Sequence, residues 1–198
     1  MAPVTRRDRI AQVAISHINC SATESSLAYI DVVVRPEDRT NDRIGHFVAS
    51  RMFCTAALFA LGCLRLAGCV EPECTATCMP GGAIRNPMAD IQHLARRFEG
   101  WMTSSPPVPA PHRGDIWVIA DEEGSKHAGV CVEDAVLERG TWTVKTVEGG
   151  HPDERNGSTA IRAFDRTFIP DGARLRLGSR YLLGYARADA MPLPDAVA

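Results

Sequence analysis

The chain has 198 residues, the length of one ordinary domain. Apolar residues make up 45% of it and charged residues 23%, which is typical of a folded globular protein and excludes a disordered one. Its 22 Lys and Arg residues against 24 Asp and Glu residues give a net charge of −2, without the basic excess that binding to nucleic acid or anionic lipid needs. We therefore expect a single domain over residues 1–190, with its core at about 45–187, followed by a flexible tail at 191–198.

No apolar run is long enough to span a membrane, because the longest one, 56–70, contains Arg65 and Gly68. The N-terminal segment is positively charged, but no continuous apolar stretch of a secretory signal follows it. We expect that the chain does not insert into a membrane. We also expect that it is made in the cytoplasm without a signal peptide.

Three segments place apolar residues at helical spacing: 4–18, about 46–67, and 87–101. Gly68 provides a stop after the second of them. Between the first two, the apolar patch Ile30–Val34 is consistent with a short strand.

After Gly114 the pattern changes to short runs rich in β-branched and aromatic residues, separated by glycine-containing turns. These runs are 115–119, 128–132, 141–147, 160–164 and 181–185. Helices first and strands afterwards predict an α+β fold, with N-terminal helices packed on one face of a five- or six-stranded antiparallel sheet.

The seven cysteines differ in their surroundings. Cys63 and Cys131 lie within apolar patterns, where a thiol is usually a small buried hydrophobe. Cys69, Cys74 and Cys78 share a loop at spacings of five and four, which fits no paired zinc framework. A local disulfide among these three remains an alternative.

Cys54 stands apart because it lies at the head of the most apolar helical run. Free N–H groups at a helix start stabilise a thiolate, which a nucleophilic cysteine needs. His127 opens a strand after a polar turn and is a candidate general base for that thiol. Glu148 ends the next strand and is a candidate to orient the imidazole, as the third member of a triad. For each of the three, an ordinary structural or solvated role is the alternative.

Four segments in this order resemble the CHAP and NlpC/P60 papain-like cysteine peptidases and amidases: Arg51–Gly68, Arg113–Ile119, Lys126–Glu133 and Lys145–Gly150. The resemblance implies a papain-like fold, with Cys54 as nucleophile, His127 as general base and acid, and Glu148 as the orienting acceptor. It implies cleavage of amide bonds in bacterial peptidoglycan through an acyl-enzyme, with no cofactor.

Two positions depart from the pattern of this family. Lys126 stands where glycine is frequent, and Gly150 replaces the usual asparagine after Glu-Gly. No Asp-rich calcium loop with proper spacing precedes Cys54, so we expect no metal.

Two other functions stay open. One is a non-catalytic binding domain of the same fold, such as a structural part of a phage tail. The other is a thiol amidase or transferase that acts on a substrate other than the cell wall. For a wall hydrolase without a signal peptide, we expect action at the cell wall or periplasm after export, injection or lysis. Its partners would be a phage tail, a secretion machine or an immunity protein.

Overall fold

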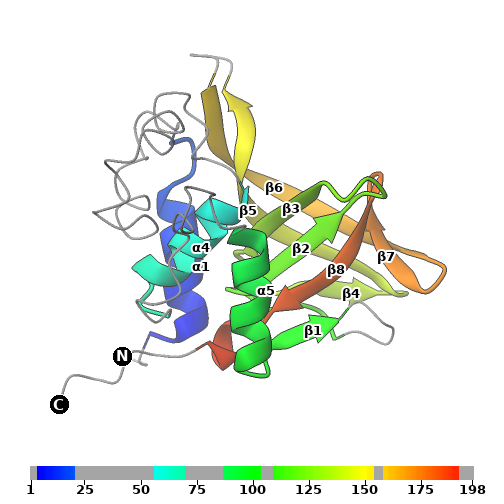
Figure 1. Cartoon of the computed structure of the whole chain (residues 1–198), viewed down its shortest axis with the longest axis horizontal. Coiled ribbons are helices and arrows are strands. Elements are labelled where there is room, and N and C mark those ends of the chain that lie inside the picture. The colour runs from blue at the N-terminus through cyan, green and yellow to red at the C-terminus, as the bar shows by residue number, and fades with distance from the viewer. Residues whose placement is uncertain (1–3, 21–55, 70–86, 104–108, 154–157, 192–198) are drawn as a thin grey trace, which may run out of the picture.

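The computed structural model describes residues 4–20, 56–69, 87–103, 109–153 and 158–191 (Figure 1). Its helices are α1 (Arg6–Ser16), α4 (Ala56–Leu66), α5 (Pro87–Arg97) and the short 3-10 helix η3 (Ala188–Ala190). The strands are β1 (Trp101–Thr103), β2 (Ile116–Ala120), β3 (Lys126–Cys131), β4 (Val136–Glu138), β5 (Thr141–Asp153), β6 (Ser158–Asp171), β7 (Arg174–Leu177) and β8 (Arg180–Ala186).

The strands form a closed antiparallel barrel. Six of them pair in the order β8-β2-β3-β5-β6-β7, and β7 pairs back with β8 to complete the ring. Strand β1 is added beside β8, and β4 is added beside β5. Figure 1 shows the three α-helices gathered on one side of this barrel.

The expected α+β, papain-like fold of helices on an open five- or six-stranded sheet is therefore wrong. The described chain is mostly β-structure, with a closed six-stranded barrel, two extra strands and three short α-helices. Two features of the strands explain why the sheet closes into a barrel. Strands β5 and β6 have 13 and 14 residues, much longer than the predicted runs, and long twisted strands coil far enough to meet at their edges. Strand β7, which we did not predict, then joins β6 to β8.

The helix predictions are confirmed where the structure describes them, as α1, α4 and α5. All five predicted strand segments also overlap observed strands, namely β2, β3, β5, β6 and β8. The predicted strand at 30–34, the first half of the predicted helix at 46–67 and nearly all of the tail at 191–198 lie outside the described residues.

Alternation along the strands produces two apolar cores. Trp117 and Ile119 of β2 point into the barrel, where the buried residues that they pack with all come from strands. Val118, between them, points outward into a second core that includes Ile10 of α1 and Leu61 of α4. The barrel thus has its own interior, and the helices cover part of its outer surface.

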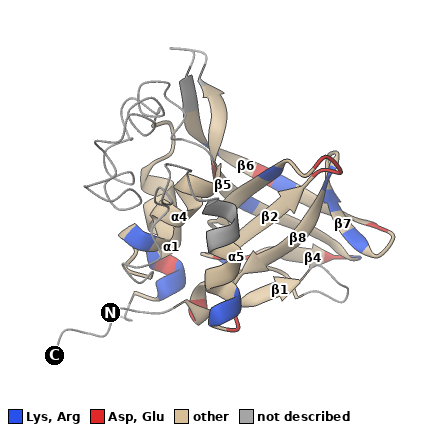
Figure 2. Ribbon diagram, in the orientation of Figure 1, with Lys and Arg blue, Asp and Glu red and all other residues tan. Residues whose placement is uncertain are grey.

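Charged residues of both signs are spread over the described strands and turns, with acidic residues at the β2–β3 turn (Figure 2). Among the described residues, no helix is long and apolar enough to cross a membrane.

Candidate functional site

The candidate site is built around Glu148, an ionisable residue with no solvent exposure. It lies on β5, on the side of the strand that carries the barrel residues Trp142 and Val144. Period-two alternation therefore directs its carboxylate inward, at the end of the barrel where β2 ends and β3 begins. Burying an ionised carboxylate in such a place costs several kcal/mol of folding free energy unless neighbouring groups compensate its charge.

The compensation comes from three strands. The guanidinium of Arg166, on β6, donates from Nε to Oε1 at 2.7 Å and from Nη2 to Oε2 at 2.6 Å. The Thr146 hydroxyl donates to Oε1 at 2.6 Å. Oε2 also accepts from Nε2 of His127 at 2.7 Å and from Nε2 of His151 at 3.1 Å. Since a carboxylate offers about four lone-pair sites, Glu148 has no acceptor capacity left.

These contacts keep Glu148 ionised. Burial raises the pKa of its carboxyl, but the hydrogen bonds from Arg166, His127, His151 and Thr146 outweigh burial and hold that pKa well below its usual range. At neutral pH, Glu148 is therefore an acceptor only, and each nitrogen that faces it must carry a hydrogen.

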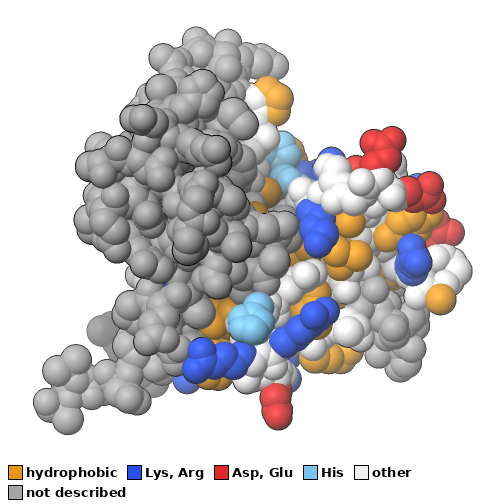
Figure 3. Space-filling view, in the orientation of Figure 1, with side chains coloured by type: hydrophobic (Ala, Val, Ile, Leu, Met, Phe, Trp, Pro, Cys, Tyr) orange, Lys and Arg blue, Asp and Glu red, His pale blue; other side chains and the backbone are white. Residues whose placement is uncertain are grey.

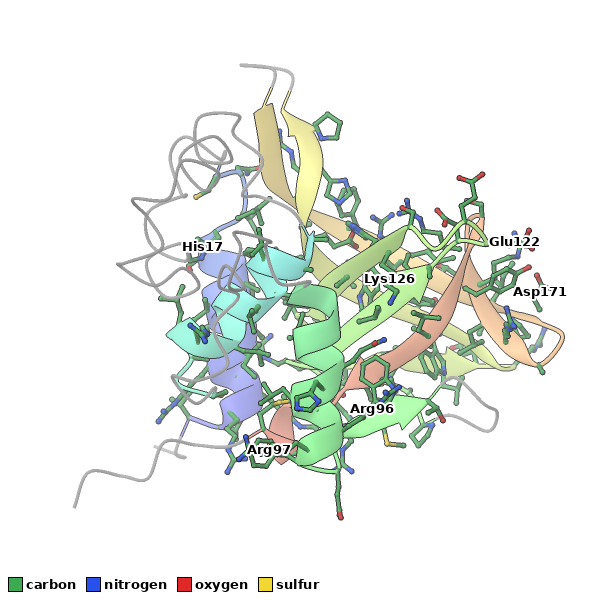
Figure 4. All side chains as sticks on the ribbon, viewed as in Figure 1. His17, Arg96, Arg97, Glu122, Lys126 and Asp171 are labelled. Atoms are coloured by element: carbon green, nitrogen blue, oxygen red, sulfur yellow. The ribbon has the colours of Figure 1, made fainter. Side chains whose placement is uncertain are left out.

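His127 lies at the start of β3, directly after Lys126, which is labelled in Figure 4. Because Nε2 donates to Glu148, the neutral ring carries its lone pair on Nδ1. Among the described residues, Nδ1 has no hydrogen-bond partner. The indole of Trp117 packs against the imidazole, with ring centroids 5.7 Å apart, and the side chain is 15% exposed. His127 is thus an oriented base with one nitrogen available for chemistry.

Gly129 makes this arrangement sterically feasible. A Cβ atom at this position would lie 2.4 Å from Cζ2 of Trp117 and 2.8 Å from Cγ of Glu148. Both contacts are closer than carbon atoms tolerate, so a residue without a side chain is needed for the indole and the carboxylate to approach β3.

His151 joins the site through a β-bulge. Opposite β6, Glu148 pairs with Arg162 and His151 pairs with Ala160, so β5 holds one extra residue between the two pairs. Residues three apart in a regular strand face opposite sides; the extra residue returns His151 to the side of Glu148. Gly150 supplies the backbone for this bulge with a φ of +81°.

The ring of Phe164, on β6, joins two of these groups. Its centroid lies 4.3 Å from that of His151, and the Cζ atom of Arg166 lies 4.0 Å from it. Phe164 therefore packs against two of the side chains that donate to Glu148. On the face in Figure 3, a histidine surface is visible below the projecting ends of β5 and β6.

Of the three predicted site residues, the structure brings His127 and Glu148 together, while Cys54 lies outside the described residues. Cys54 precedes Ala56, the first residue of α4, by two positions, and α4 contacts both β3 and β5. The strands that carry His127 and Glu148 are thus neighbours of this helix. The prediction that Cys63 and Cys131 are buried is confirmed.

Sequence reasoning missed His151 and Arg166. The signal for His151 was the Gly149-Gly150 pair, because consecutive glycines at a strand end are typical of a bulge that redirects the next side chain. Arg166 alternates with Phe164 and Phe168 on one face of β6, which is an unusual place for an arginine without a partner.

No protein-family model, curated protein or solved structure matches this chain.

Proposed function

We propose that this chain is a cysteine-dependent hydrolase of peptide or amide bonds, with His127 as the proton-transfer residue, Glu148 as the group that orients it and Cys54 as the nucleophile. The observation that carries the proposal is the 2.7 Å bond from His127 Nε2 to the buried Glu148, which leaves Nδ1 as an oriented base. A cysteine hydrolase needs this pair: a thiol is a weak nucleophile until a positioned base takes its proton.

The proposed reaction has two halves. In the first, Nδ1 of His127 takes the Cys54 proton, the sulfur attacks the carbonyl carbon, and the imidazolium returns the proton to the leaving amine as the C–N bond breaks. In the second, water attacks the resulting thioester, the C–S bond breaks, and the acid product leaves. Glu148 stays ionised throughout, because Arg166 stabilises its charge, and it therefore stabilises the imidazolium without taking its proton.

We propose amide bonds of bacterial peptidoglycan as the substrate. This choice rests on the resemblance of the segments around Cys54, His127 and Glu148 to those of wall-cleaving peptidases and amidases. We propose that the chain acts at the cell wall or periplasm, with a phage tail, a secretion machine or an immunity protein as its partner.

The second candidate is a metal centre. The ligand atoms of His127, Glu148 and His151 all lie within 4.8 Å of one another, and two histidines with one carboxylate form a common catalytic zinc site. Arg166 counts against it: its guanidinium occupies both oxygens of Glu148, so a divalent ion would sit beside a fixed positive charge and displace donors already bound.

Iodoacetamide labelling separates these functions, with the modified cysteine identified by peptide mass spectrometry. We expect selective labelling of Cys54 at pH 7, at a rate that falls about tenfold or more in His127→Ala and Glu148→Gln. The matched control is His112→Ala, because His112 is an exposed histidine outside the site.

Uniformly slow labelling of all cysteines would contradict the proposal and favour a binding domain. Hydrolysis that a chelator abolishes and zinc restores would favour the metal centre.

A further inference from the structure

The site contains a second imidazole with the same relation to Glu148 as the first. His151 Nε2 and His127 Nε2 both donate to Oε2, at 3.1 and 2.7 Å, and the two rings meet edge to face with centroids 5.4 Å apart. Nothing in the proposed reaction has yet used the second ring.

The tautomer of His151 follows from its partner. Because Glu148 is ionised and only accepts, Nε2 of His151 carries the hydrogen and Nδ1 carries the lone pair. In an imidazole the two nitrogens lie on opposite sides of the ring, so Nδ1 of His151 faces away from the buried carboxylate. The side chain is 22% exposed, more than the 15% of His127, so water has the better access to this ring.

Three ionisable groups face His151: Glu148 on its own strand, His127 on β3 and Arg166 on β6. Two imidazoles therefore share one carboxylate, whereas deprotonation of the thiol needs only one of them.

We propose that His151 is a second proton-transfer residue, which activates the water that hydrolyses the acyl-enzyme; this inference rests on the proposed function. Nδ1 of His151 takes a proton from water, and the water oxygen forms a bond to the acyl carbon. The C–S bond then breaks with its electron pair on sulfur, and the imidazolium gives its proton to solvent. His127 serves the formation of the acyl-enzyme, and His151 serves its breakdown.

The test compares His151→Gln with His127→Ala in single-turnover reactions on muropeptides from purified peptidoglycan, followed by intact-protein mass spectrometry. A glutamine amide keeps a donor for Glu148 but has no basic nitrogen, so it preserves a purely structural role. We expect His151→Gln to form the acyl-enzyme at nearly the wild-type rate and to hydrolyse it about 100-fold more slowly, so that the adduct accumulates. His127→Ala should form no adduct.

A pH profile adds a second readout. The rate constant for hydrolysis of the acyl-enzyme should fall on the acid side in the wild-type chain and lose this acid limb in His151→Gln, whereas kcat/KM, which reports formation of the acyl-enzyme, should keep the same pH profile in both proteins. Hydrolysis of the adduct by His151→Gln at the wild-type rate would overturn this inference but not the proposed function. Absence of hydrolysed product with the wild-type chain together with absence of an adduct in His151→Gln, on every muropeptide, would overturn the proposed function. Long-range ¹H–¹⁵N spectra that show His151 protonated on Nδ1 would overturn the inference whatever the hydrolysis assay shows.

Discussion

Replacing Arg166 by methionine should destabilise the protein by about 3 kcal/mol at pH 7. Breaking a buried ion pair from one side costs about 3–5 kcal/mol, because the remaining charge is left without compensation. Glu148 is fully buried, and the substitution removes two hydrogen bonds of 2.7 and 2.6 Å to it. The lower end of the range applies because Thr146 and the two histidines continue to donate to the carboxylate. For a chain of this size, that loss lowers Tm by about 6–12 °C.

The same substitution should reverse the pH dependence that Glu148 confers on the stability of the fold. In the wild-type protein the folded pKa of Glu148 is depressed, so its stabilisation is complete above the unfolded pKa and is lost as the pH falls through the folded one. Without Arg166, we expect burial to outweigh the remaining hydrogen bonds and to raise the folded pKa of Glu148 above the unfolded one, so that Glu148 stabilises the protein as the pH falls. The difference between wild type and Arg166→Met should therefore shrink from pH 7 to pH 4.

Urea unfolding followed by tryptophan fluorescence at both pH values measures this difference. Lys145→Met is the matched control, since it removes an exposed ion pair to Glu133 from β5, the strand that carries Glu148, and should cost less than about 1 kcal/mol. The double variant Arg166→Met, Glu148→Gln should recover part of the free energy of unfolding that Arg166→Met loses. A difference below about 1 kcal/mol at pH 7, or one that does not change with pH, would refute the claim that Arg166 compensates a buried charge.

Three further predictions concern glycines and a thiol. Gly129→Ala should cost about 1–3 kcal/mol and shift the fluorescence of the displaced Trp117, because the new Cβ would lie 2.4 Å from its ring; an unchanged Tm would show that β3 and the indole separate freely. Gly150→Asn should retain the bulge and the acyl-enzyme kinetics, since asparagine tolerates a φ of +81°. Gly150→Val should lower the free energy of unfolding by about 1–2 kcal/mol and displace His151. Equal Tm values for the two variants would count against the bulge. Burial raises the pKa of the Cys63 thiol, so Cys63 should stay unlabelled by iodoacetamide in the native protein at pH 8 and react only after unfolding in urea; labelling of the folded chain would contradict its burial.

The sequence predicted the local elements better than the architecture. Helical spacing and alternation are properties of short windows, and they located α1, α5 and the five β-rich runs. Barrel closure depends on how far β5 and β6 continue beyond their apolar residues. The ends of these strands carry charged residues, glycines and prolines, which local patterns assign to turns.

The site was predicted in part for the same reason. His127 and Glu148 stand beside the ends of the predicted runs 128–132 and 141–147, so their proximity followed from the order of the motifs. Arg166 belongs to the extension of β6 beyond the predicted run of 160–164. His151 is on the side of Glu148 only because of an extra residue in β5, and the strand period alone would place it on the opposite side.

Digestion of purified peptidoglycan by the wild-type chain and by His127→Ala, read by mass spectrometry of the released fragments, tests the central claim most directly. The account predicts that the wild-type chain releases fragments cut at an amide bond and that His127→Ala, folded to the same extent by circular dichroism, releases none above background. Equal release by the two proteins would contradict it.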